Sequence, residues 1–153
     1  MEEHSSRPPF RWLPYVCLAL IVLGIGVATY LTITHYTTTV TLACPENSVI
    51  NCAKVTSSSY SVIFGIPLAV LGLAYFIGIF ALYLPKVWHA KNPLLPWVRL
   101  AAVLSGMVMV FWLLYVELFL VNAFCLYCTA LHIIIFLLFV LTVFGTALTP
   151  KTA

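Results

Sequence analysis

Five cysteines are the residues of this chain whose type and spacing suggest chemistry, and four of them form two pairs. Cys125 and Cys128 make a C-x-x-C motif, whereas Cys44 and Cys52 are more widely spaced. If the motif opens a helix, its two cysteines share one face, so their sulfurs can meet. A helix N-terminus also favours the thiolate, which is the reactive form of cysteine. The motif therefore predicts a redox centre.

The two pairs also have less reactive interpretations. They are compatible with two inert structural disulfides, or with a site for Zn²⁺ or another soft metal. The metal interpretation is weakened because Cys44 and Cys52 are further apart than the roughly two to four residues of common zinc sites. We therefore expect no metal. The fifth cysteine, Cys17, is a lone thiol in an apolar stretch and is expected to be a small core residue.

The rest of the chain is too apolar for a soluble protein. Of its 153 residues, 63% are hydrophobic and only 7% are charged, whereas about 25% are charged in soluble domains. A membrane-spanning helix needs about 20 largely apolar residues. Four stretches qualify, namely residues 13–33, 63–84, 95–121 and 126–148. We therefore expect an all-α integral membrane protein, a four-helix transmembrane bundle that forms one domain over residues 1–153.

The positive charges predict how this bundle is oriented. With four spans, one face of the membrane receives Arg7, Arg11, Lys86, Lys91, Arg99 and Lys151, and the other receives only Lys54. The positive-inside rule makes the first face cytoplasmic and places both termini there. The net charge of +3 is too small an excess to indicate a nucleic-acid partner. The two cysteine pairs then lie on the exoplasmic face of a multi-pass cell-membrane protein, where disulfides persist.

Two pairs on one face suggest a relay. Thiol–disulfide exchange proceeds through mixed disulfides, so electrons can pass from one pair to the next. A loop over residues 36–61 that carries Cys44 and Cys52 can reach both a soluble partner and the membrane pair. The final acceptor must take two electrons inside the bilayer. A quinone does this, and the sequence shows no haem or flavin motif.

These residues resemble the vitamin K epoxide reductase family in its bacterial, quinone-dependent branch. The most specific stretch is CAKVTSSSYSVIFGIPLAVLG, residues 52–72, and CLYC at 125–128 completes the pattern. The order of the motifs also fits, because the functionally similar DsbB family carries its C-x-x-C in the first outer loop instead. The resemblance covers residues 12–148. It implies a bundle whose outer loop caps a quinone pocket, with a menaquinone, ubiquinone or vitamin K type of quinone.

The resemblance also implies a role for each cysteine. Cys128 would lie nearest the quinone, Cys125 would exchange with Cys52, and Cys44 would react with the partner protein. His132 lies four residues after Cys128, on the same helical face. The family often has a tyrosine there that hydrogen-bonds a quinone carbonyl, and histidine can donate the same bond. The alternative is that His132 is an interior polar group satisfied by the protein itself.

Five further residues are candidates for the site, each with a plainer alternative. Ser58 matches a loop serine of the family, and Ser61 falls near a position where some members place an asparagine toward the quinone; either serine can instead cap a helix. Phe64 and Phe124 are expected to wall the quinone pocket, or else to pack or face lipid. Glu117 lies within a span, where ionisable groups are functional candidates, although it can also be hydrated near the interface.

The resemblance implies a membrane thiol–quinone oxidoreductase that supports disulfide formation. Many bacterial relatives carry a fused thioredoxin-like domain, and this chain shows none, so we expect a thioredoxin-fold, DsbA-like partner in trans and the membrane quinone pool as acceptor. Three alternatives stay open: reduction of vitamin K or its epoxide as the main role, a non-catalytic scaffold braced by disulfides, and a soft-metal importer. The importer would need a path of cysteines through the membrane, and the cytoplasmic half of this bundle is expected to hold only Cys17.

Overall fold

The computed structural model describes residues 11–37 and 41–148, which are mostly helical. The helices are α1 (Leu13–Tyr36), α2 (Cys52–Thr56), the 3-10 turn η1 (Ser59–Ser61), α3 (Leu68–Tyr83), α4 (Pro85–Trp88), α5 (Leu95–Tyr115), the π-helical turn η2 (Val116–Val121) and α6 (Leu126–Leu148). Two short strands, β1 (Val62–Ile63) and β2 (Ile66–Pro67), pair as an antiparallel hairpin.

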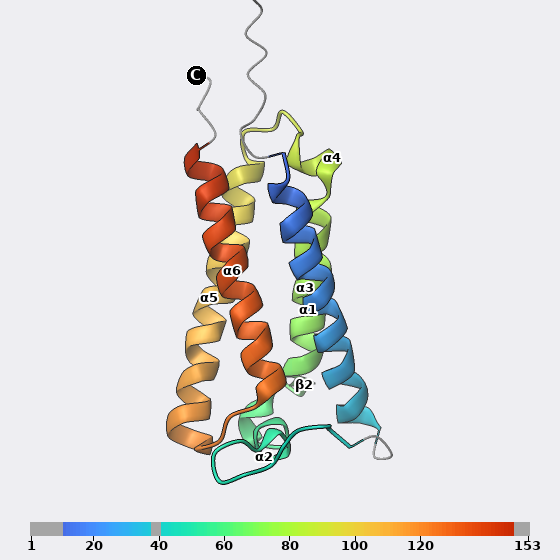
Figure 1. Ribbon diagram of the computed structural model, residues 1–153, viewed down its shortest axis with the longest axis vertical. Helices are drawn as coiled ribbons and strands as arrows, with labels where there is room; N and C mark the ends of the chain where they lie inside the picture. The colour runs from blue at the N-terminus through green and yellow to red at the C-terminus, as the bar shows by residue number, and fades with distance from the viewer. Residues whose placement is uncertain (1–10, 38–40, 149–153) are drawn as a thin grey trace, which may run out of the picture.

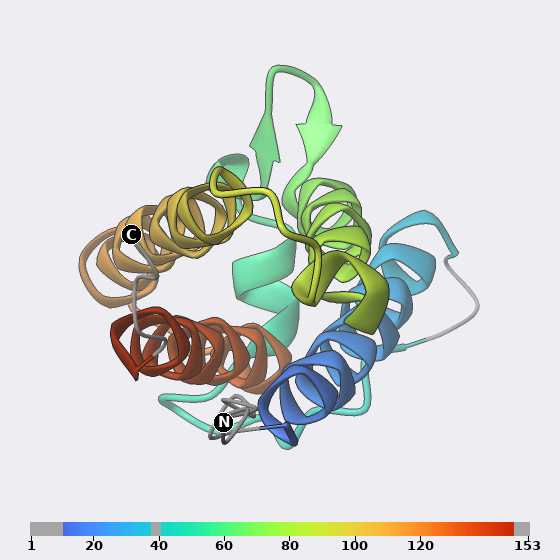
Figure 2. The same ribbon diagram turned by 90° about the horizontal axis from the view of Figure 1, so that it is seen from above.

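Four helices stand side by side and form the body of the molecule, namely α1, α3, α5 and α6 (Figure 1). We call the end that carries residues 41–67 and 122–125 the loop end, and the opposite end, which carries α4, the α4 end. Seen along the bundle, α2 lies in the middle of the ring of helices and the hairpin projects outward from it (Figure 2). The short helix α2 therefore closes the loop end of the bundle.

The bundle is held together by apolar side chains from all four long helices. The buried core consists of Cys17, Ile21, Ala28, Phe76, Ile79, Tyr83, Val103, Ile134 and Leu138. Gly24 lets α1 approach α3 closely, because a Cβ at this position would overlap the ring of Phe76. Cys17 is fully buried, and this confirms it as a small core residue.

Three of the helices are long and apolar enough to cross a membrane within the described residues. They are α1 with 24 residues, α5 continued by η2 with 27, and α6 with 23. The shorter α3 has 16 residues, or ~24 Å at 1.5 Å per residue. Large apolar side chains such as Val108, Phe111 and Phe144 are exposed on the outside. A surface of this kind faces lipid rather than water, so the chain is a helical membrane protein.

The expected second span begins later than its hydropathy indicates. We expected a helix from Ile63, but residues 62–67 form the hairpin and α3 begins at Leu68. The turn between the strands places Phe64 at φ 51° and Gly65 at φ 80°. Two successive residues with positive φ make the type of turn that joins hairpin strands, and a right-handed helix cannot contain them. The expectation for residues 63–67 was therefore wrong.

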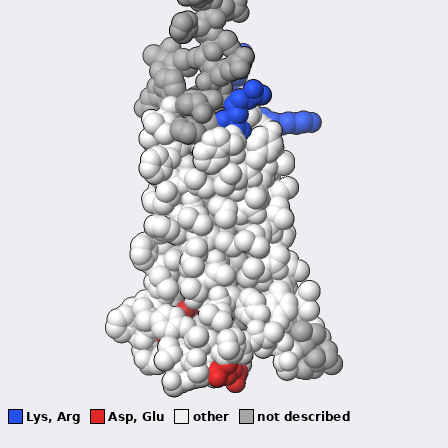
Figure 3. Space-filling view, in the orientation of Figure 1, with Lys and Arg blue, Asp and Glu red and all other residues white. Residues whose placement is uncertain are grey.

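The charged residues are distributed unequally along the bundle. Figure 3 shows Lys and Arg side chains gathered at the α4 end and acidic side chains at the loop end. Arg11 precedes α1, Lys86 lies in α4 and Lys91 follows it, whereas Lys54 lies in α2 at the loop end. Arg7 and Lys151 lie outside the described residues.

Candidate redox site

A backbone pairing brings the two cysteine segments together. Ile50 and Phe124 form a parallel bridge, in which the N–H of Asn51 donates to the carbonyl of Phe124 at 3.0 Å. The N–H of Phe124 in turn donates to the carbonyl of Val49 at 2.9 Å. The next residue in each segment is a cysteine, Cys52 in one and Cys125 in the other. Both are fully buried, so this pairing sets the two cysteines beside each other at the loop end.

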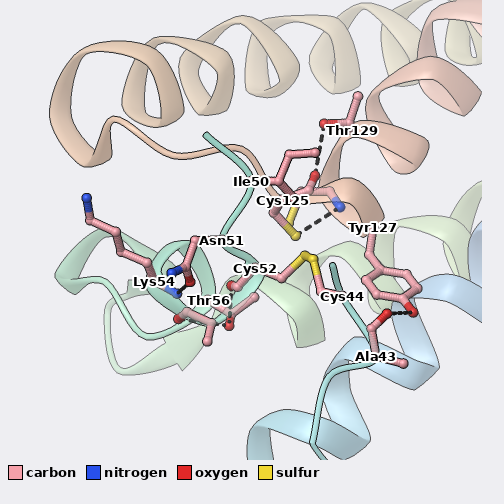
Figure 4. Close-up of a disulfide and its surroundings, with 12 residues drawn as sticks. Ala43, Cys44, Ile50, Asn51, Cys52, Lys54, Thr56, Cys125, Tyr127 and Thr129 are labelled. Atoms are coloured by element: carbon pink, nitrogen blue, oxygen red, sulfur yellow. Dashed lines mark hydrogen bonds between the residues drawn. A yellow bond between two sulfur atoms is a disulfide. The ribbon is translucent and has the colours of Figure 1, made fainter. Parts of the chain in front are cut away.

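The loop pair is oxidised in this structure. Cys44 and Cys52 form a disulfide with an S–S distance of 2.01 Å, and Figure 4 shows it beside Cys125. Cys52 opens α2, whose N-cap Asn51 accepts a hydrogen bond from the N–H of Lys54 at 2.8 Å. Such a cap fixes the first turn of a short helix. Cys52 is thereby held inside the protein, while Cys44 is only half-buried and can be reached from outside.

The second pair consists of free thiols at the start of α6. Cys125 immediately precedes the helix and Cys128 lies in its first turn. The N–H of Cys128 donates to Sγ of Cys125 at 3.3 Å. A hydrogen bond from the Cys128 side chain lowers the pKa of Cys125 below that of an ordinary thiol, although burial acts in the opposite direction. Cys125 is therefore the more readily ionised thiol of the pair, and the thiolate is the reactive form of cysteine.

A cavity of about 240 Å³ lies next to this pair, among α1, α3, α5 and α6 at the loop end. Its walls are mostly apolar, and Cys128, Glu117 and His132 are among the lining residues. Glu117 and His132 are 2% and 7% exposed. Oε2 of Glu117 and Nδ1 of His132 have no hydrogen-bond partner among the described residues. Since buried polar groups are nearly always hydrogen-bonded, this cavity has room for a ligand that supplies those partners.

Glu117 owes its position to an irregular helix. It lies in η2, where α5 widens into a π-helical turn, and such turns are frequent at functional sites. The backbone amide of Cys125 is a hydrogen-bond partner of its carboxyl group. The carboxyl group therefore connects the C-x-x-C segment with the cavity.

The two candidate serines line the cavity but are engaged locally. The hydroxyl of Ser58 donates to the carbonyl of Val55 at 2.8 Å, and that of Ser61 donates to the carbonyl of Ser58 at 2.7 Å. Both serines thus stabilise the turns between α2 and the hairpin. Their side chains contribute to the cavity wall without an unpaired donor to offer to a ligand.

The two candidate phenylalanines lie elsewhere. Phe64 is at the tip of the hairpin and is 100% exposed, because the turn points it away from the bundle. Phe124 contributes its backbone to the pairing with residues 49–51, and neither ring lines the cavity. A contact of these two rings with a quinone therefore stays a prediction, and it gains no support from the walls of this cavity. The walls instead include Tyr75 and Met109, which apolar periodicity does not distinguish from core residues.

The chain is thus an apolar helical bundle that holds one oxidised and one reduced cysteine pair beside a cavity. The chain matches the model of the vitamin K epoxide reductase family over residues 15–143. This match covers most of the chain, so the protein belongs to the vitamin K epoxide reductase family, whose members are oxidoreductases. A search of curated proteins gives no match.

Proposed function

We propose that the protein is a thiol–quinone oxidoreductase that passes electrons from the loop pair to the membrane pair and then to a quinone. The observation that carries this proposal is the backbone pairing of residues 49–51 with Phe124, which sets Cys52 against Cys125. The membrane pair lies beside a mostly apolar cavity, and its lining residues Glu117 and His132 each carry a polar atom that is unpaired among the described residues. Family membership supports a quinone as the acceptor.

The electron path has three steps, and each is a two-electron exchange. A partner dithiol reduces the Cys44–Cys52 disulfide and becomes a disulfide itself. The loop dithiol then reduces a Cys125–Cys128 disulfide through a mixed disulfide of Cys52 and Cys125. Finally the Cys125 and Cys128 thiols become a disulfide again while the quinone becomes a quinol. The oxidised loop and reduced membrane pair of this structure correspond to the state between the second and third steps.

The cavity fits a quinone head group by the chemistry of its donors. A quinone accepts two electrons and two protons at its carbonyl oxygens. His132 would donate a hydrogen bond from Nδ1, and Glu117 would hold a proton at Oε2, because both buried atoms lack a partner among the described residues. Cys128 lines the same cavity and would be the thiol nearest the acceptor. The apolar walls would exclude water from the exchange.

The orientation follows from the charges. The α4 end would face the cytoplasm together with both termini, because Lys and Arg residues concentrate there. With α3 as the fourth, short span, the loop end and its four cysteines would lie on the exoplasmic face of the cell membrane. Residues 41–61 would then cap the quinone cavity.

Quinone reduction by the purified protein tests this function. A reduced thioredoxin-fold protein is supplied as electron donor, and quinone absorbance is followed for the wild type, Cys128→Ala and Cys17→Ala. We expect Cys128→Ala to abolish turnover and Cys17→Ala to retain it, since Cys17 is buried in the core away from the cavity. No turnover by the wild type with any quinone, with thiols that resist mild reductant, would favour the disulfide-braced scaffold.

The partner is tested separately by trapping. We propose a thioredoxin-fold protein in trans, because Cys44 is the accessible cysteine of the loop disulfide. A Cys52→Ala variant leaves Cys44 without its resolving thiol, so a mixed disulfide with the partner should accumulate. Capture of one thioredoxin-fold protein through its active-site cysteine is the expected result. Unselective capture of many thiol proteins would contradict it.

A further inference from the structure

Two tyrosine hydroxyls hold the residue that precedes Cys44. The N–H of Ala43 donates to Oη of Tyr30 at 3.2 Å, and Oη of Tyr127 donates to the carbonyl of Ala43 at 2.8 Å. The two rings lie against each other, with their centroids 5.1 Å apart. Figure 4 shows Tyr127 reaching Ala43 beside the disulfide. We call Tyr30, Ala43 and Tyr127 the tyrosine clamp.

The clamp ties the loop to the C-x-x-C motif itself. Tyr127 stands between Cys125 and Cys128 in the first turn of α6, and Tyr30 lies in α1. The loop disulfide is therefore fixed on both sides of the motif. Phe124, just before Cys125, holds the Cys52 side through backbone bonds, and Tyr127, just before Cys128, holds the Cys44 side.

The segment between these two attachments bonds mainly with itself. The side-chain oxygen of Asn47 accepts hydrogen bonds from the N–H groups of Val49 and Ile50, and the N–H of Asn47 donates to the carbonyl of Ile50. Residues 45–49 are exposed. On the other side of Ala43, Leu42 lines the cavity. The clamp is thus the attachment that keeps Cys44 and Leu42 against the bundle.

The clamp becomes important when the Cys44–Cys52 disulfide is reduced. While the loop disulfide exists, Cys44 is held near Cys52 by a covalent bond. Once the bond opens, the clamp bonds at Ala43 remain to restrict the neighbouring Cys44 among the contacts of the described residues. The exchange of the proposed function forms a Cys52–Cys125 mixed disulfide, and Cys44 must then attack the sulfur of Cys52. The Cys52–Cys125 bond breaks, the Cys44–Cys52 bond forms and Cys125 leaves as a thiolate, so no external oxidant is consumed in this step.

We propose that Tyr30 and Tyr127 are positioning residues that hold Cys44 ready to resolve the Cys52–Cys125 mixed disulfide. This inference rests on the proposed function. Holding two reacting groups in place raises their effective concentration, and a hydrogen bond changes an equilibrium by roughly 2- to 10-fold. The clamp therefore accelerates the transfer of electrons from the loop to the membrane pair, without a part in the reduction of quinone.

Conservative variants test the clamp. Tyr127→Phe and Tyr30→Phe each remove one hydroxyl and keep the ring contact. We expect each to lower turnover with a reduced thioredoxin-fold donor by roughly 5-fold, and the double variant to lower it further. The Cys52–Cys125 species should accumulate during turnover, as measured by acid quenching and peptide mapping under non-reducing conditions. A merely structural role of the hydroxyls would not produce this species.

Two controls separate the clamp from the rest of the site. In a Cys44→Ala, Cys52→Ala background, dithiothreitol must reduce the membrane pair directly, and Tyr127→Phe should leave that quinone reduction unchanged. Tyr36→Phe, at the exposed end of α1, should behave as the wild type. An active wild type with equally active clamp variants and no mixed disulfide would overturn this inference alone. An inactive wild type would instead overturn the proposed function.

Discussion

The two ends of the bundle both bury polar side chains, but they differ in whether the protein supplies hydrogen-bond partners for them. At the α4 end, Arg99 is 4% exposed and donates to the carbonyls of Leu82 and Val87 at 3.0 and 2.8 Å. Its guanidinium also lies over the ring of Trp88, 4.3 Å from the centroid. The hydroxyls of Tyr83 and Thr142 bond to each other. Each of these groups thus has protein partners.

At the loop end, buried polar groups lack such partners. Glu117 and His132 line the cavity, and Oε2 of Glu117 and Nδ1 of His132 are unpaired among the described residues. A buried polar group that is satisfied by the protein stabilises the fold, whereas an unsatisfied one costs stability. The comparison therefore indicates that the buried polar groups of the α4 end stabilise the fold, whereas those of the loop end are available to bind a ligand. Substitutions at the two ends should affect different measurements.

The largest expected effect follows from His132→Leu. Removing a donor placed at a developing charge typically lowers turnover by about 100-fold, and we expect this loss in quinone reduction. The variant should unfold at the same temperature as the wild type or higher, because it removes an unpaired buried group. His132→Gln, which keeps a donor, should lose less activity. A His132→Leu protein with full turnover but lower thermal stability would place His132 among the structural residues instead.

Arg99→Met tests the α4 end, where we expect a change in stability and no change in turnover. It leaves the carbonyls of Leu82 and Val87 without their donor, so we expect a loss of about 2 kcal/mol in the free energy of unfolding. Methionine keeps most of the apolar stem against Trp88. Turnover per folded molecule should not change, since the cavity lies at the other end. Unfolding in detergent and quinone reduction on the same preparation decide between these outcomes.

The sequence predicted the long helices and the cysteine motif better than the cavity. Long apolar runs locate α1, α5 and α6, and the spacing of Cys125 and Cys128 locates the start of α6, because both signals are local. The hairpin was not predicted, because residues 62–67 are as apolar as a membrane helix. The tyrosine clamp was not predicted, because Tyr127 and Ala43 are hydrogen-bonded although they lie 84 residues apart in the sequence. The π-helical turn that carries Glu117 also depends on packing rather than on composition.

A pair of glycines compares packing at the two ends with matched substitutions. A Cβ on Gly145 would lie 2.7 Å from the side chain of Leu13, and one on Gly106 would lie 2.9 Å from Cζ of Tyr75. Gly145→Ala should therefore cost about 1 kcal/mol of stability through overpacking, with turnover unchanged. Tyr75 borders the cavity, and its hydroxyl donates to the carbonyl of Ala102 at 2.9 Å, so displacement of the ring by Gly106→Ala should raise KM for quinone severalfold and also lower stability. Equal losses of stability with no change in KM would argue against a ligand in this cavity.

The smallest expected effect concerns the pH dependence of Cys125. The hydrogen bond from Cys128 lowers the pKa of Cys125, so its thiolate should persist to a lower pH than that of an ordinary cysteine. Thiolate absorbance can be followed against pH in a Cys17→Ala, Cys44→Ala, Cys52→Ala background, and again after Cys128→Ala. Removal of the donor should move the Cys125 midpoint to higher pH.

The direction of this shift shows how Cys128 affects the reactivity of Cys125 at the loop end. A lowered midpoint would mean that Cys125 leaves readily as a thiolate when Cys44 attacks Cys52, since a thiol of lower pKa is the better leaving group. If the midpoint does not move when Cys128 is replaced, Cys128 does not set the pKa of Cys125, and Cys125 would owe its reactivity to the amides at the start of α6.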